Sequence, residues 1–139
     1  MNILFICKYN AFRSRIAEEY FRKINRNPSV KIISRGLIMG GVPDKEQIQI
    51  SKQILGIKIN KRKALPVTKS ELKEADLIVV VANDIPRIIF DYNGNILQKK
   101  VRIWKIKDEQ NRNKNNIKTI VLLIKDKVER LNKELEKRK

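Results

Sequence analysis

A cysteine and an arginine separated by five residues give this sequence its clearest capacity for chemistry. Cys7 is the only cysteine of the chain, and Arg13 is followed directly by the hydroxyl of Ser14. A cysteine thiolate is a strong nucleophile, and a guanidinium can hold two oxygens of an oxyanion with its planar fork. A loop between them that turns its backbone N–H groups toward one centre would complete an anion site. The spacing therefore fits attack of sulfur on a bound phosphate, giving a cysteinyl-phosphate intermediate.

The residues on either side of this loop indicate how it is positioned. The apolar run 3–6 is too short for a helix and is rich in strand formers. Beyond the loop, apolar residues recur at helical spacing, at Ile16, Ala17, Tyr20, Phe21 and Ile24. A loop that leads from a strand into a helix brings unpaired N–H groups and the positive end of the helix dipole to the anion. That positive field favours the thiolate, and the Ser14 hydroxyl can donate a hydrogen bond to the sulfur.

The rest of the chain predicts an alternation of strands and helices. Thr68 and Glu71 form a capping-box pattern, and Asp84 is expected to cap the short helix that begins with it. Strands are expected at 30–34, 77–81 and 101–104, and helices at 45–55, from about 68 to 75, at 84–90 and at 115–137. Right-handed crossovers in this order give an α/β fold, a parallel sheet with helices on both faces. The length is that of one domain, residues 1–139.

The motif and its position resemble a known family. A strand, then Cys-x5-Arg-Ser, then Ile16-Ala17-Glu18-x-x-Phe21 is similar to the low-molecular-weight protein tyrosine phosphatases and their arsenate reductase relatives. The resemblance covers nearly the whole chain and is most specific from Cys7 to Ser14. It implies a four-stranded parallel sheet in the order 2-1-3-4, with the site at the carboxyl edge of the first strand. It also implies a phosphomonoesterase that works without a metal or other cofactor.

The resemblance implies a role for each residue of the motif. Cys7 becomes the nucleophile and Arg13 the phosphate clamp. Asp108, on the loop after the fourth strand, becomes the general acid that protonates the leaving oxygen and the base that later activates water. Ser34, at the end of the second strand, is expected to pair with Asn10. The residues that bind the phosphate are then Lys8, Tyr9, Asn10, Ala11, Phe12, Arg13 and Ser14.

Four positions depart from the family's pattern. Glu109 follows Asp108 where the family usually has proline, so Glu109 is an alternative proton donor. Arg62 stands where relatives carry a histidine of the hydrogen-bond network behind the phosphate loop, which leaves open how that network is completed. Ala11 replaces a larger aliphatic residue of tyrosine-directed members or a threonine of arginine-directed ones, so phosphotyrosine and phosphoarginine both stay open. Phe12 replaces a second cysteine, which excludes a disulfide within the loop.

Two other functions use the same loop. An arsenate reductase needs further thiols to release arsenite, and because Cys7 is alone an external thiol would have to supply them. A non-catalytic binder of anions or nucleic acid would keep the loop without turnover. The formal net charge of +17 permits contacts with nucleic-acid phosphates, but the basic residues are spread over the chain and only eight aromatics are present for stacking.

Composition sets the remaining expectations. The chain has no histidine, so the usual transition-metal ligands are nearly absent. It shows neither a long apolar stretch nor the pattern of a signal peptide, and we expect a cytoplasmic protein with no membrane partner. The favoured partner is a phosphorylated protein or small phosphomonoester, with inorganic phosphate as the product.

Overall fold

The sheet is built from four parallel strands within the part of the chain that the structure describes. A computed structural model gives residues 1–38, 40–59, 62–90, 99–108 and 113–138. The strands are β1 (Asn2–Cys7), β2 (Lys31–Gly36), β3 (Leu77–Val80) and β4 (Val101–Ile103). Their order is β2-β1-β3-β4, and each neighbouring pair is parallel. The predicted α/β fold and its strand order are therefore confirmed.

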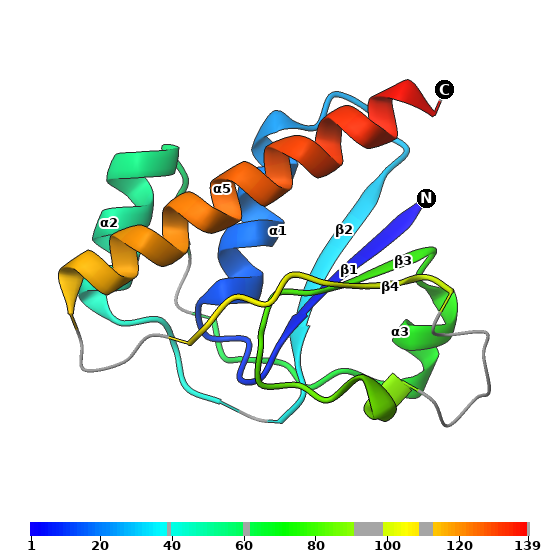
Figure 1. Ribbon diagram of the computed structural model, residues 1–139, viewed down its shortest axis with the longest axis horizontal. Coiled ribbons are helices and arrows are strands. Elements are labelled where there is room, and N and C mark those ends of the chain that lie inside the picture. The colour runs from blue at the N-terminus through cyan, green and yellow to red at the C-terminus, as the bar shows by residue number, and fades with distance from the viewer. Residues whose placement is uncertain (39, 60–61, 91–98, 109–112, 139) are drawn as a thin grey trace.

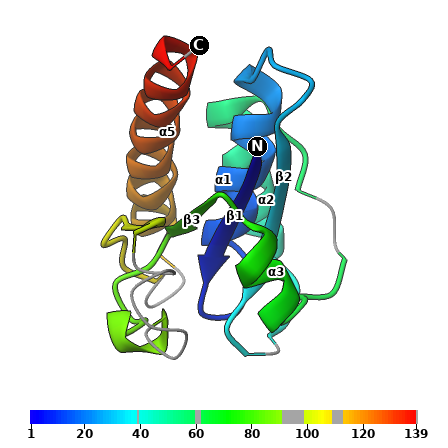
Figure 2. The same cartoon turned by 90° about the vertical axis from the view of Figure 1, so that its right-hand side faces the viewer.

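Helices cover both faces of this sheet (Figures 1 and 2). They are α1 (Arg13–Ile24), α2 (Lys45–Leu55), α3 (Lys69–Glu74) and α5 (Lys114–Lys137), with a 3₁₀ helix, η1 (Arg87–Phe90). On β1, Ile3 and Phe5 point into a core shared with α1, α2 and α5, whereas Leu4 and Ile6 point into a second core with α3 and η1. This alternation follows from the two-residue repeat of a strand.

Local sequence rules explain where the helices begin and end. Thr68 accepts a hydrogen bond from the backbone of Glu71, whose side chain bonds back to the Thr68 backbone, so the predicted capping box forms. Gly56 ends α2 in the left-handed conformation, at φ 65°. By contrast Phe12, at the start of α1, provides no side-chain cap. The first backbone N–H groups of α1 are thus left for whatever the preceding loop binds.

One predicted element differs. The helix expected over residues 84–90 is a 3₁₀ helix from Arg87 to Phe90, and Asp84 does not cap it. The Asp84 carboxylate instead accepts hydrogen bonds from Arg13, which lies far away in sequence. A charged partner binds a carboxylate more strongly than a backbone amide does, so the tertiary contact replaces the local cap.

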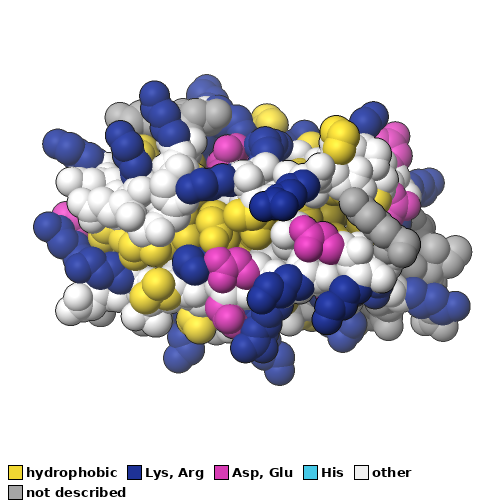
Figure 3. Space-filling model, turned by 90° about the horizontal axis from the view of Figure 1, so that it is seen from above, with side chains coloured by type: hydrophobic (Ala, Val, Ile, Leu, Met, Phe, Trp, Pro, Cys, Tyr) yellow, Lys and Arg dark blue, Asp and Glu magenta, His cyan; other side chains and the backbone are white. Residues whose placement is uncertain are grey.

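The basic residues do not gather into one patch on the face that Figure 3 shows. Lysine and arginine side chains are scattered over it, interleaved with acidic ones and flanking an apolar band. The helix α5 carries its apolar stripe inward, with Ile117, Val121 and Ile124 fully buried. None of the helices in the described ranges is long and apolar enough to cross a membrane.

Candidate active site

The loop between β1 and α1 wraps around the sulfur of Cys7. The backbone N–H of Asn10 donates to Cys7 Sγ over 3.2 Å, and Ser14 Oγ lies 3.1 Å from the same sulfur. Asn10 makes this curvature possible because it takes the left-handed conformation, at φ 54°, which asparagine tolerates better than most residues. The expected hydrogen bond between Ser14 and the sulfur is present.

A second segment holds this loop from outside. Leu37 N donates to the carbonyls of Cys7 (3.1 Å) and Lys8 (2.9 Å), at the point where β2 ends. Two glycines permit the contact: a Cβ on Gly36 would lie 2.9 Å from the carbonyl carbon of Tyr9, and one on Gly40 would lie 2.5 Å from its oxygen. Any side chain at these positions would push the loop away from β2.

Arg13 is buried, with 2% of its surface exposed, and three acceptors fix its guanidinium. Nη1 donates to the carbonyl of Ile106 over 2.9 Å and to Asp84 Oδ1 over 3.2 Å, while Nη2 lies 3.4 Å from Asp84 Oδ2. On the third side, Nε lies 3.7 Å from Asp108 Oδ1. The clamp predicted from the motif is therefore held by residues that follow β3 and β4.

A pocket brings the predicted residues together. Cys7, Arg13 and Asp108 all line it, although they come from β1, α1 and the segment after β4. Asp108 is partly exposed there, while Glu109, the alternative proton donor, lies outside the described residues. The other residues of the phosphate loop on the pocket wall are Tyr9, Ala11 and Phe12. Lys8, Asn10 and Ser14 do not line it, and the last two are buried behind the loop.

Several residues of this region were missed by sequence reasoning. Gly41, Val42 and Gln47 form the pocket wall that comes from the start of α2. Gln47 is buried because its side chain closes the capping box with Asp44. Asp84 was detectable in principle, since it follows β3 and the carboxyl ends of parallel strands meet at one edge. Among the residues described, no group of three or more His, Cys, Asp or Glu is arranged to hold a metal ion.

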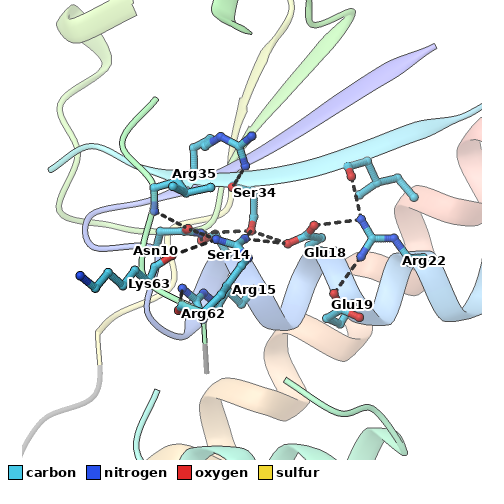
Figure 4. Close-up of polar contacts among 12 residues, drawn as sticks. Asn10, Ser14, Arg15, Glu18, Glu19, Arg22, Ser34, Arg35, Arg62 and Lys63 are labelled. Carbon is cyan, nitrogen blue, oxygen red and sulfur yellow. Dashed lines mark hydrogen bonds and ion pairs between the residues drawn. The ribbon is translucent and has the colours of Figure 1, made fainter. Parts of the chain in front are cut away.

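Behind the loop lies a buried polar network (Figure 4). Asn10 Nδ2 donates to Ser14 Oγ over 2.7 Å and to Ser34 Oγ over 3.1 Å, so the expected pairing of Asn10 with Ser34 is present. Arg62, the residue expected in place of the relatives' histidine, donates to Asn10 Oδ1 over 3.3 Å and to Ser34 Oγ over 3.2 Å. Glu18 Oε1 accepts from Ser34 Oγ over 2.5 Å and lies 3.5 Å from Arg62 Nη2.

A further arginine supports this network from the first turns of α1. Arg15 donates from Nη2 to the backbone carbonyl of Arg62. Burial lowers the pKa of Arg15 from its usual value, and the neighbouring charge of Arg62 lowers it further, whereas Glu18 and Cys7 act in the opposite direction. Arg15 thus holds the backbone of the segment whose side chain completes the network.

Comparison with known proteins decides the family. The family model described as low molecular weight phosphotyrosine protein phosphatase matches residues 2–139. The chain belongs to this family. The family expected from the motif between Cys7 and Ser14 is thereby confirmed. A search of curated protein sequences found no match.

Solved structures of two phosphatases and an arsenate reductase share the fold. A low molecular weight phosphotyrosine phosphatase from Vibrio cholerae superposes with a TM-score of 0.84 at 19% identity, covering 99% of this chain and 98% of that one. The YwlE arginine phosphatase from Geobacillus stearothermophilus gives 0.80 at 17% identity, with 99% and 94% covered. An arsenate reductase from Archaeoglobus fulgidus gives 0.75 at 23% identity, with 94% and 98% covered.

Proposed function

We propose that the protein is a cysteine-dependent phosphatase that hydrolyses phosphotyrosine in proteins without a metal or other cofactor. The observation that carries the proposal is the shared pocket of Cys7, Arg13 and Asp108. These three residue types supply a nucleophile, an oxyanion clamp and a proton donor, which is the set that the reaction needs. The family to which the chain belongs supports the phosphatase activity.

The reaction has two steps. The Cys7 thiolate attacks phosphorus, the bond to the leaving oxygen breaks, and Asp108 gives that oxygen its proton. Water then attacks the cysteinyl-phosphate, Asp108 takes the proton of the water, and the bond between sulfur and phosphorus breaks. Free phosphate and the Cys7 thiolate result. Through both steps Arg13 and the loop N–H groups stabilise the charge on the phosphoryl oxygens.

The walls of the pocket favour an aromatic phosphate ester. Tyr9 and Val42 both line the pocket and both are exposed, so they offer apolar surface to a flat ring. Ala11 adds a small side chain beside them and leaves room for the ring. Phosphoarginine is the second candidate, because a structural relative is named an arginine phosphatase and because the Asp108 carboxylate, which lines the pocket, would attract a guanidinium.

Hydrolysis of p-nitrophenyl phosphate in the presence of EDTA tests this function. We expect activity in the wild type, no activity in Cys7→Ser, and a large loss in Asp108→Asn because the amide cannot transfer a proton. Asp126→Asn is a matched control, since Asp126 pairs with Arg130 on the exposed side of α5. An inert wild type whose thiol is shown to be reduced would contradict the proposal. If the wild type is active, competition between phosphotyrosine and phosphoarginine peptides identifies which of the two it prefers.

A further inference from the structure

The network behind the phosphate loop ends in two opposite charges, Arg62 and Glu18. Arg62 comes from the segment between α2 and α3, and Glu18 from α1, so the pair joins parts of the chain that are far apart in sequence. Figure 4 shows Asn10, Ser14 and Ser34 grouped beside this pair. The side chain of Glu18 is largely buried, and that of Arg62 is about one-third exposed.

Arg62 fixes the orientation of the Asn10 amide. Asn10 Oδ1 faces two groups that can only donate, Arg62 Nη1 at 3.3 Å and the backbone N–H of Leu65 at 3.2 Å. Turning the amide over would place its NH₂ group against both donors. Asn10 Nδ2 must therefore point toward the two serine hydroxyls, Ser14 and Ser34.

The same logic sets the proton of each hydroxyl. Ser34 Oγ accepts from Asn10 and from Arg62, so its own proton goes to the Glu18 carboxylate 2.5 Å away, which only accepts. Ser14 Oγ accepts from Asn10, which leaves its proton free to point at Cys7 Sγ, 3.1 Å away. Arg62 and Glu18, together with the backbone N–H of Leu65, thus set an order of protons in which the sulfur receives a hydrogen bond from Ser14.

We propose that Arg62, with Glu18 as its counter-charge, is a positioning residue that keeps this order of protons the same at every working pH. A histidine at this position would change from two donors to one donor and one acceptor as it loses its proton. A guanidinium stays charged and cannot make that change. The inference rests on the proposed phosphatase function.

The groups around the pair agree with this role. Glu18 also binds Arg22 Nη2 over 2.9 Å, Arg15 holds the Arg62 backbone, and the charges of Glu18 and Cys7 both act on Arg15. None of these side chains is an imidazole, because the chain has no histidine. The charged groups that contact the pair are therefore guanidinium and carboxylate groups from α1 and the segment before α3, with no imidazole among them.

Substitution of Arg62 tests the inference through kcat/KM for p-nitrophenyl phosphate. Arg62→Ala is expected to lose about tenfold or more, since a hydrogen bond from a charged donor is removed, and Arg62→Lys to recover part of that loss. Arg102→Ala is the matched control: Arg102, on β4, is about as exposed as Arg62, 33% against 31%, and pairs with Glu134 of α5. That control is expected to stay within about twofold of wild type.

The pH profile of Arg62→His distinguishes control of the proton order from a purely structural role of residue 62, because only the former makes the activity depend on the charge of the imidazole. Its activity relative to wild type should be highest where the imidazole is charged and should fall as the pH rises through the imidazole pKa. A ratio that stays constant from about pH 5 to 9 would overturn the proposal. So would Arg62→Ala that keeps the kcat/KM of wild type.

Binding of inorganic phosphate, measured by calorimetry, separates this proposal from the proposed function. If the wild-type enzyme hydrolyses no substrate, the proposed function is wrong, and the positioning role of Arg62 is then tested by the affinity for phosphate alone. We expect Arg62→Ala to bind phosphate more weakly than both wild type and Arg102→Ala, and equal affinities would overturn the proposal. If Arg62→Ala does not fold, Glu18→Gln is compared with Glu19→Gln, because both carboxylates pair with Arg22 and Glu18 alone of the two contacts Arg62 and Ser34 among the described residues. Weaker phosphate binding by Glu18→Gln than by Glu19→Gln supports the proposal, and equal affinities overturn it.

Discussion

Replacing Asp84 with alanine tests how the phosphate clamp is held. The Asp84 carboxylate lies 3.2 and 3.4 Å from the two terminal nitrogens of Arg13, whose other partners are the Ile106 carbonyl and Asp108. A hydrogen bond to a charged group contributes about 1.5–3 kcal/mol. Because Asp84 is 31% exposed, water replaces part of the lost contact, and we expect a net cost of about 1–2 kcal/mol in transition-state binding. That corresponds to a loss of roughly 5- to 30-fold in kcat/KM.

Steady-state hydrolysis of p-nitrophenyl phosphate, together with inhibition by inorganic phosphate, measures this loss. Asp84→Asn should lose less than Asp84→Ala, because the amide keeps one acceptor oxygen. Asp76→Ala is the control: its carboxylate accepts from Asn2 N at 2.7 Å, at the opposite end of β3, so it should lower stability and leave kcat/KM unchanged. If kcat/KM of Asp84→Ala equals or exceeds that of wild type, Asp84 does not orient Arg13 and this reasoning is wrong.

Two further substitutions probe the loop and the core. Gly40→Ala should cost about 1–3 kcal/mol of stability and weaken phosphate binding in calorimetry, because its Cβ would lie 2.5 Å from the Tyr9 oxygen. A Cβ on Gly41 meets nothing within 4 Å, so Gly41→Ala should leave the melting temperature unchanged. Tyr20→Phe removes the hydrogen bond to Glu129, 2.5 Å long, and should lower the free energy of unfolding by about 1 kcal/mol with unchanged kcat. The hydrogen bond from Tyr20 is the largest cause that lowers the pKa of Glu129, followed by the one from Lys125. The loss of unfolding free energy in Tyr20→Phe should therefore be complete above about pH 4.5 and become smaller as the pH falls further. Burial raises the pKa of Tyr20 to about 12, so its hydroxyl keeps its proton and the loss of unfolding free energy should persist through neutral pH. Urea titrations in which Tyr20→Phe and wild type are equally stable at pH 7 would contradict this.

The elements that the sequence predicted are those set by local patterns. The uninterrupted run that became β3 is buried at every position, as expected for a central parallel strand. The capping box of Thr68 and the glycine at position 56 marked helix ends because their effect depends on neighbouring backbone alone. The loop around Cys7 was predictable for the same reason, since its spacing joins two adjacent elements.

The features that the sequence did not predict depend on partners distant in the chain. Asp84 satisfied the local rule for a helix cap, but Arg13 reaches it across the carboxyl edge of the sheet and takes its place. Val42 and Gln47 enter the pocket only because the start of α2 folds over the loop. Arg62 was singled out from the sequence, yet its contacts with Asn10 and Glu18 require the tertiary structure.

Detection of a phosphoryl group on Cys7 tests the central claim most directly. Asp108→Asn should slow the hydrolysis of the intermediate, because no carboxylate remains to activate water, and rapid acid quenching after mixing with p-nitrophenyl phosphate should trap it. Mass spectrometry of the peptide that contains Cys7 is expected to show the added mass of one phosphoryl group, absent in Cys7→Ala. Turnover of the substrate with no phosphoryl group on Cys7 at any quench time would contradict the account.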